Sequence, residues 1–225
     1  VKKLEQLYSS YDTEIIITDP ISSQLIKYLA NTYLPMRLSF ANEATRLVEY
    51  SNANLQDVLK GVGLDTRIGS HYFRPSPSWG GSCFPKDLVE VNNFYKRDEL
   101  NLPLISNIIE SNDEHLEWTV NQLISLKQSN NLERVYLIGA AFKEDTDDLR
   151  NSPTLDIYKI LSKMEIEVII LDQKIQVPEH SHVSSINDIV SNSLVSIMYP
   201  QKDDFISELN KFCSKNNCVI YYPWS

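Results

Sequence analysis

Glycine is scarce in this sequence of 225 residues: there are six, at positions 61, 63, 69, 80, 81 and 139. No two of them stand at the spacing G-x-G-x-x-G or G-x-x-x-x-G-K. The chain therefore contains neither the glycine fingerprint of dinucleotide-binding domains nor a P-loop. Any nucleotide that it binds must be recognised by other means.

Cysteine is also rare. The three cysteines, Cys83, Cys213 and Cys218, are an odd number, and they form no dense framework of the kind that secreted domains use. We therefore expect a reducing, cytoplasmic location. Cys213 and Cys218 are not followed by a second pair of cysteines or histidines, so no metal site is predicted.

Positive charge and long apolar runs are lacking as well. Twenty-one basic residues face 30 acidic ones, giving a formal net charge of -9, which argues against broad binding to nucleic acid or to acidic membranes. No run approaches the ~18 apolar residues of a membrane span, and no charged-then-apolar leader is present. Neither nucleic acid nor membrane is an expected partner.

The first 130 residues have the periodicity of helices. After a charged start over residues 1–18, with one β-like run at Glu14–Thr18, Asp19-Pro20 is a helix-start signal. A long amphipathic helix then runs to about Tyr50, and further helices are expected at about 54–60, 85–95 and from Pro103 onward. The apolar residues of the long helix recur at spacings of three and four: Leu25, Leu29, Tyr33, Met36, Phe40, Ala44 and Leu47.

The pattern changes near residue 130. Short apolar runs at 135–138, 168–171, 194–198 and 219–222 alternate with helical segments after Pro153 and at about 203–213. The fold class is therefore α/β overall: a remnant or linker (1–18), an all-α central domain (19–130) and a Rossmann-like three-layer α/β domain (131–225).

The segment from Trp79 to Asp87 concentrates the reactive chemistry. Cys83 precedes a helix whose first turn contains Pro85, and both the helix dipole and Lys86 favour a thiolate there. Asp87, four residues on, is expected on the same helical face, where a carboxylate would activate water. A buried structural cysteine is the alternative.

Lys27 and Asn31 form a second group of candidate site residues. Their spacing of four residues places a cation and an amide on one helical face, an arrangement that can hold a developing oxyanion. A surface lysine is the alternative for Lys27.

Five short motifs occur in this sequence in the same order as in a known protein family. They are Lys27-x-x-x-Asn31, Ser39-Phe40-x-Asn42-Glu43, Asp65-x-Arg67-Ile68-Gly69, the run Gly80 to Asp87, and Gly139-x-Ala141-Phe142-Lys143. This order is similar to that of the UDP-glucose/GDP-mannose dehydrogenase family, and closest to its UDP-glucose 6-dehydrogenases. The separation of lysine and cysteine, 83 − 27 = 56 residues, also fits.

The resemblance implies an activity. Family members oxidise the primary alcohol of a nucleotide sugar twice with NAD, trapping the aldehyde on a cysteine as a thiohemiacetal that becomes a thioester and is hydrolysed to the uronate. Cys83 would be that nucleophile. Lys27 and Asn31 would hold the sugar oxygen, and Asp87 would activate water or tune Lys27.

The resemblance also implies the binding residues and the assembly. The loop from Arg67 to Gly81 would cover UDP-glucose or a related nucleotide sugar, with Tyr72, Ser76 and Gly80 at the ligand and Arg67 reaching a neighbouring subunit. Phe142 and Lys143 would also bind substrate, and Arg150 would lie near NAD. A homodimer is expected through the long helix, residues 19–50.

Three departures from the family pattern keep alternatives open. The turns Tyr199-Pro200-Gln201-Lys202 and Tyr222-Pro223-Trp224-Ser225 replace an acidic-aromatic turn and an Asp-Arg turn, and nothing in residues 1–18 can supply the NAD-binding domain with which family members begin. We expect little or no activity from this chain alone. The alternatives are a stand-alone dimerisation or nucleotide-sugar-binding module, a GDP-mannose or UDP-N-acetylhexosamine dehydrogenase, and a cysteine hydrolase using His71.

Overall fold

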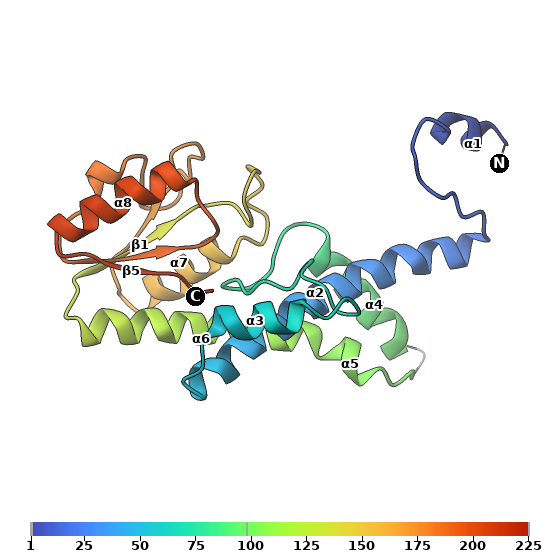
Figure 1. Ribbon diagram of the computed structural model, residues 1–225, viewed down its shortest axis with the longest axis horizontal. Coiled ribbons are helices and arrows are strands. Elements are labelled where there is room, and N and C mark those ends of the chain that lie inside the picture. The colour runs from blue at the N-terminus through green and yellow to red at the C-terminus, as the bar shows by residue number, and fades with distance from the viewer. Residues whose placement is uncertain (1, 98, 225) are drawn as a thin grey trace.

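The computed structural model describes residues 2–97 and 99–224. A helical half and a sheet half lie end to end, and the N-terminal residues extend away from both (Figure 1). The helical half contains α1 (Lys2–Tyr8), α2 (Pro20–Tyr50), α3 (Leu55–Gly63), α4 (Phe84–Arg97), α5 (Pro103–Ser106) and α6 (Ile108–Ser129).

The long helix α2 begins where the sequence predicts. The Asp19 side chain caps it by accepting the N–H groups of Ile21 and Ser22, both at 3.0 Å, and Pro20 fits the first turn because its missing N–H is not needed there. Two predictions were wrong. The run Glu14–Thr18 pairs with no strand, and the helix from Pro103 is interrupted at Asn107.

The sheet half holds five parallel strands in the order β3-β2-β1-β4-β5. The strand order therefore reverses between the neighbours β1 and β4. The predicted α/β architecture is confirmed, and only the two-residue β3 and the short η1 helix were missed. The elements are β1 (Arg134–Ile138), α7 (Pro153–Lys163), β2 (Val168–Leu171), β3 (His182–Val183), η1 (Ile186–Asp188), β4 (Ser193–Ile197), α8 (Asp203–Lys215) and β5 (Val219–Tyr221).

Alternate residues of the strands face two apolar layers. On one face, Val135 and Leu137 pack with residues of α7 and the C-terminal part of α6; on the other, Tyr136 and Ile138 pack with residues of α8 and η1. Because α6 begins in the helical half and ends against the sheet, it joins the two halves (Figure 1).

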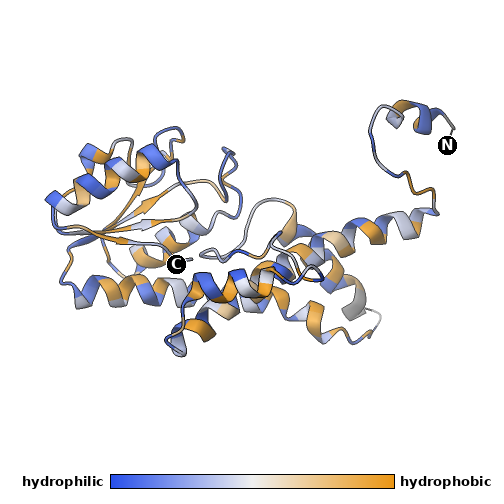
Figure 2. Cartoon of the chain, viewed as in Figure 1, coloured by the Kyte–Doolittle hydropathy of each residue, from blue (hydrophilic) through white to orange (hydrophobic). Residues whose placement is uncertain are grey.

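Helix α2 has an unusual distribution of polarity. Its buried positions are mostly polar or small, whereas many of its large apolar side chains are exposed. Orange, hydrophobic segments recur between blue ones along this helix in Figure 2. None of the described helices is long and apolar enough to cross a membrane. The buried residues of α2 are Thr32, Pro35, Ser39, Ala41, Asn42, Thr45 and Val48.

Candidate active site

Cys83 stands immediately before α4, at the helix end where unpaired backbone N–H groups favour negative charge. Its carbonyl accepts the N–H of Asp87 at 3.0 Å, and the Ser82 hydroxyl lies 3.7 Å from its sulfur. The thiol is exposed, so a buried structural cysteine is excluded. It is in position to react with a molecule from solution.

Asp87 lies beneath this turn with only 1% of its surface exposed. Asn31 donates to one carboxylate oxygen at 2.6 Å, Lys86 donates to the other at 2.6 Å, and the Lys27 ammonium lies 3.1 Å from the first. The predicted meeting of Lys27 and Asn31 therefore occurs, because residues four apart on α2 share one face.

The charge state of Asp87 follows from these contacts. Burial opposes its ionisation, but the hydrogen bonds from Lys86, Asn31 and Lys27 outweigh burial and lower the pKa of Asp87 to about 2. Such a carboxylate is a weak base. The Lys86 ammonium, expected beside the thiol, donates to Asp87, and that hydrogen bond raises the pKa of Lys86.

The sheet half contacts the Cys83 turn directly. A Cβ atom on Gly80 would lie 1.8 Å from the carbonyl oxygen of Asn151, and one on Gly81 would lie 2.8 Å from the Phe142 ring. The Asn151 amide also donates to the Gly81 carbonyl at 3.0 Å. Gly80 therefore serves the contact between the two halves, where the backbone needs a residue without a side chain.

Two basic residues of the sheet half stand near this contact. The Lys143 ammonium lies 5.5 Å from the centre of the Phe142 ring, and the exposed Arg150 is bound by Asp148 at 2.8 and 2.9 Å. The Asp148 hydrogen bonds raise the pKa of Arg150, and the charge of Cys83 makes a further small contribution. Arg150 immediately precedes Asn151, whose amide binds the Gly81 carbonyl, so it lies next to the contact with the Cys83 turn.

The loop before Cys83 presents the remaining predicted residues. Arg67 is exposed and bound by Asp65 at 2.6 Å, while His71 is an exposed loop residue. Tyr72 has a positive φ of 54° and its ring centre lies 6.3 Å from that of Phe84. The Ser76 hydroxyl is occupied, donating to the Ser78 carbonyl at 3.0 Å.

Sequence reasoning missed the buried groups that hold this loop. The Asn112 side chain accepts the Trp79 N–H at 2.8 Å and donates to the Trp79 carbonyl at 3.1 Å. Asn42 accepts the N–H of Ser76, and His115 contacts the Ser76 carbonyl at 2.9 Å. Polar residues at the apolar spacing of α2 and α6 were the available signal.

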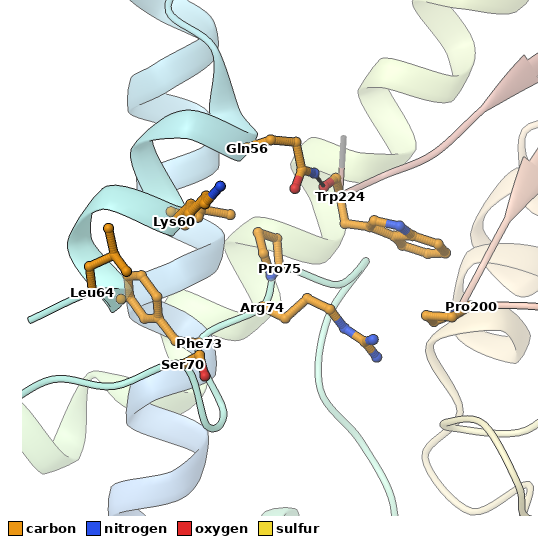
Figure 3. Close-up of a pocket in the computed structure, with 11 residues that line it drawn as sticks. Gln56, Lys60, Leu64, Ser70, Phe73, Arg74, Pro75, Pro200 and Trp224 are labelled. Carbon is orange, nitrogen blue, oxygen red and sulfur yellow. Dashed lines mark hydrogen bonds between the residues drawn. The ribbon is translucent and has the colours of Figure 1, made fainter. Parts of the chain in front are cut away.

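A cavity of about 520 Å³ lies between α3, this loop and the sheet half (Figure 3). Phe73 and Trp224 supply aromatic surface, and Lys60 and Arg74 supply positive charge. Cys83, Lys27 and Asn31 are outside its lining. The described residues include no cluster of three or more His, Cys, Asp or Glu that could hold a metal ion.

Comparisons with known proteins agree with the motifs. Residues 21–114 match the central domain of the UDP-glucose/GDP-mannose dehydrogenase family, and residues 136–221 match its UDP binding domain. A UDP-glucose 6-dehydrogenase of Rickettsia felis is 35% identical over 69% of this chain and 35% of its own length. The Bacillus subtilis enzyme TuaD is 33% identical over 80% of this chain and 39% of its own.

Solved structures show the same fold. A UDP-glucose dehydrogenase of Pyrobaculum islandicum superposes with a TM-score of 0.84 over the whole chain and 52% of its own, at 24% identity. The UDP-N-acetyl-mannosamine dehydrogenase Cap5O of Staphylococcus aureus gives 0.72 over 88% of this chain and 45% of its own, at 26% identity. The chain spans roughly a third to two fifths of the curated relatives it matches. It belongs to the UDP-glucose/GDP-mannose dehydrogenase family, of which it contains the central and UDP-binding domains.

Proposed function

We propose that this chain is the substrate-binding and thiol-bearing part of a nucleotide-sugar dehydrogenase that converts UDP-glucose to UDP-glucuronate. The observation that carries this proposal is the exposed Cys83 thiol, one turn from an ionised Asp87 bound by Lys27 and Asn31. The names of the curated relatives support UDP-glucose as the sugar.

Cys83 acts on the aldehyde stage of the reaction. Its thiolate adds to the aldehyde carbon of the sugar, forming a C–S bond while the carbonyl oxygen becomes an alkoxide that Lys27 and Asn31 stabilise. Once that adduct has been oxidised to a thioester, water adds to the acyl carbon and the C–S bond breaks. The products are the uronate and the free thiol.

Asp87 positions these groups. A carboxylate with a pKa of about 2 is a poor proton acceptor near neutral pH, so a role as general base for water is disfavoured. Its two oxygens instead fix the Lys27 ammonium and the Asn31 amide beside the Cys83 turn. Of the two roles expected from the resemblance, the tuning of Lys27 is the one we propose.

NAD is the oxidant of the family, but the described sheet offers it no suitable site. The turn after β1 reads Gly139-Ala140-Ala141-Phe142, and the N–H groups of Ala140 and Phe142 are bound by Asp172 and by the Asp148 carbonyl. A phosphate would have to compete with these protein acceptors for the donors of the turn. We derive no oxidation step from these residues. Arg150 is the proposed contact with a dinucleotide held elsewhere.

The nucleotide end of the substrate is assigned to the cavity and the loop beside it. Phe73 and Trp224 suit the flat base, and Arg74 and Lys60 suit the phosphates. Tyr72, next to Phe73 in sequence, has its ring centre 6.3 Å from that of Phe84, so the loop leads from the cavity toward Cys83. Ser76, Gly80, Phe142 and Lys143 complete the proposed substrate-binding set.

A homodimer through α2 completes the proposed assembly. Large apolar side chains stay exposed along this helix, with Leu25, Leu29 and Tyr33 each about half exposed and Leu47 67% exposed. A second copy would cover them. The exposed guanidinium of Arg67, prearranged by Asp65, would then reach the substrate of the second copy.

The test is protection of the thiol. We expect the aldehyde form of UDP-glucose to slow alkylation of Cys83 by iodoacetamide at least tenfold. UDP-glucose should slow it less, and free glucose should not slow it. Mass spectrometry of the alkylated protein measures the rate. Lys27→Met should abolish the difference between aldehyde and alcohol. Exposed Lys159→Met is the matched control. Equal protection by aldehyde and alcohol would favour a binding module without catalysis, and no protection would contradict the proposal.

A further inference from the structure

Tyr199 fills the place where open α/β sheets bind ligands. Such sheets take their ligands outside the carboxyl ends of the strands, where the strand order reverses. Here that place is the crevice between β1 and β4. Gly139 follows β1 with a φ of +98°, and Tyr199 follows β4 by two residues.

The tyrosine ring lies directly over the glycine. A Cβ atom on Gly139 would lie 2.5 Å from two ring carbons of Tyr199 and 2.9 Å from its hydroxyl oxygen. The absent side chain of Gly139 would otherwise leave its backbone open to a phosphate or a sugar, but the ring occupies this space.

The hydrogen-bonding groups of the turn are occupied as well. The Gly139 N–H binds the Leu171 carbonyl and the Ala140 N–H binds the Asp172 carboxylate, both at 2.9 Å. The Tyr199 hydroxyl donates to the same Asp172 carboxylate at 3.5 Å. The side chain of Tyr199 therefore binds the turn as a ligand would.

We propose that Tyr199 is a specificity-determining residue that closes the strand-end crevice to nucleotides. A nucleotide sugar then binds outside the crevice, against the loop of residues 72–83 and Phe142, and the sheet half has no second nucleotide site. This inference rests on the proposed function only in taking UDP as the relevant nucleotide.

Removal of the ring tests the proposal. Amide hydrogen exchange of residues 139–141 is measured with and without UDP, for the wild type, Tyr199→Ala and Tyr199→Phe. We expect UDP to leave exchange unchanged in the wild type and in Tyr199→Phe, which keeps the ring. In Tyr199→Ala, UDP should slow exchange at these amides at least fivefold and bind at least tenfold more tightly by calorimetry.

Tyr221→Ala, which removes a partly buried tyrosine from β5 of the same sheet, is the matched control and should gain nothing at residues 139–141. Slower exchange of these amides with UDP in the wild type would overturn the proposal, a result that does not depend on how well Tyr199→Ala folds. A folded Tyr199→Ala without protection there would overturn it too. The proposed function is tested by alkylation of Cys83, whereas this proposal is tested by amide exchange after β1. Failure of one proposal can therefore be distinguished from failure of the other.

Discussion

The two halves of the molecule bury polar side chains to different extents. The sheet half encloses apolar residues on both faces of its strands, such as Leu137, Ile157 and Leu194, each with no exposed surface. The helical half buries Asn42, His115 and other polar groups between α2 and α6, and leaves large apolar side chains of α2 outside. One half is stabilised by its own core, whereas the other is organised around a loop.

This difference follows the distribution of the chemistry. The buried polar groups bind the backbone of residues 76–79, and that segment leads into the Cys83 turn. A hydrogen bond fixes direction better than apolar contact does, at little net gain in stability. The helical half therefore uses part of its interior to hold a loop in place, and it depends less on an apolar core of its own. The apolar face of α2 is left exposed, and it is the face that the proposed second copy would cover.

Loss of a sheet-core side chain should have the largest effect. Leu137→Ala removes buried methyl groups from the central strand and should lower the free energy of unfolding by about 3 kcal/mol. Exposed Met164→Ala, at the end of α7, should change it by less than about 0.5 kcal/mol. Urea denaturation measures both. An equal loss in the two variants would contradict the role of Leu137 in the core of the sheet half.

A charge on the outer face of α2 should separate the proposed dimer. Leu47→Glu would bury an unpaired carboxylate at the interface and raise the dissociation constant at least 100-fold, equivalent to about 2.7 kcal/mol. Gln24→Glu, which adds a charge to an exposed position without removing an apolar side chain, is the control. Sedimentation equilibrium gives the constants. A wild type that stays monomeric at millimolar concentration would refute the proposed dimer.

Asn112→Ala tests the polar interior of the helical half. It leaves the buried N–H and carbonyl of Trp79 without their partner and should cost about 2 kcal/mol of stability. The same variant should change the rate at which iodoacetamide alkylates Cys83, because the segment before the Cys83 turn loses the two hydrogen bonds that hold its backbone at Trp79. Asn121→Ala, on the exposed side of α6, should change neither quantity.

The same contrast explains what the sequence could predict. The strands were found within about a residue because unbroken apolar runs such as Val168–Leu171 meet a core within the chain. Spacing alone also brought Lys27 and Asn31 to one face of α2. On that helix, however, apolar periodicity marks the exposed face as much as the buried one, since Leu25, Leu29 and Tyr33 face outward.

Contacts between distant segments were beyond this reasoning. Local spacing suggested that Asp87 faces water beside the thiol, whereas the fold buries it under Lys27 and Lys86. Nothing near Tyr199 in the sequence predicts that its ring covers Gly139, sixty residues earlier. Glu14–Thr18 has the composition of a strand, but a strand needs a neighbour with which to pair.

The pH dependence of Asp87 is the smallest of the expected effects and links the polar interior to the site. The folded pKa of about 2 lies below the ordinary 3.8, so ionised Asp87 stabilises the fold fully above about pH 4, and this contribution is lost as the pH falls toward 2. Asp87→Asn removes the titration. The difference in unfolding free energy between wild type and Asp87→Asn should therefore shrink between pH 4 and 2, as measured by urea denaturation at each pH. A constant difference for Asp87→Asn would mean that the three donors around this carboxylate do not hold its charge, and the proposed positioning of Lys27 and Asn31 would fail with it.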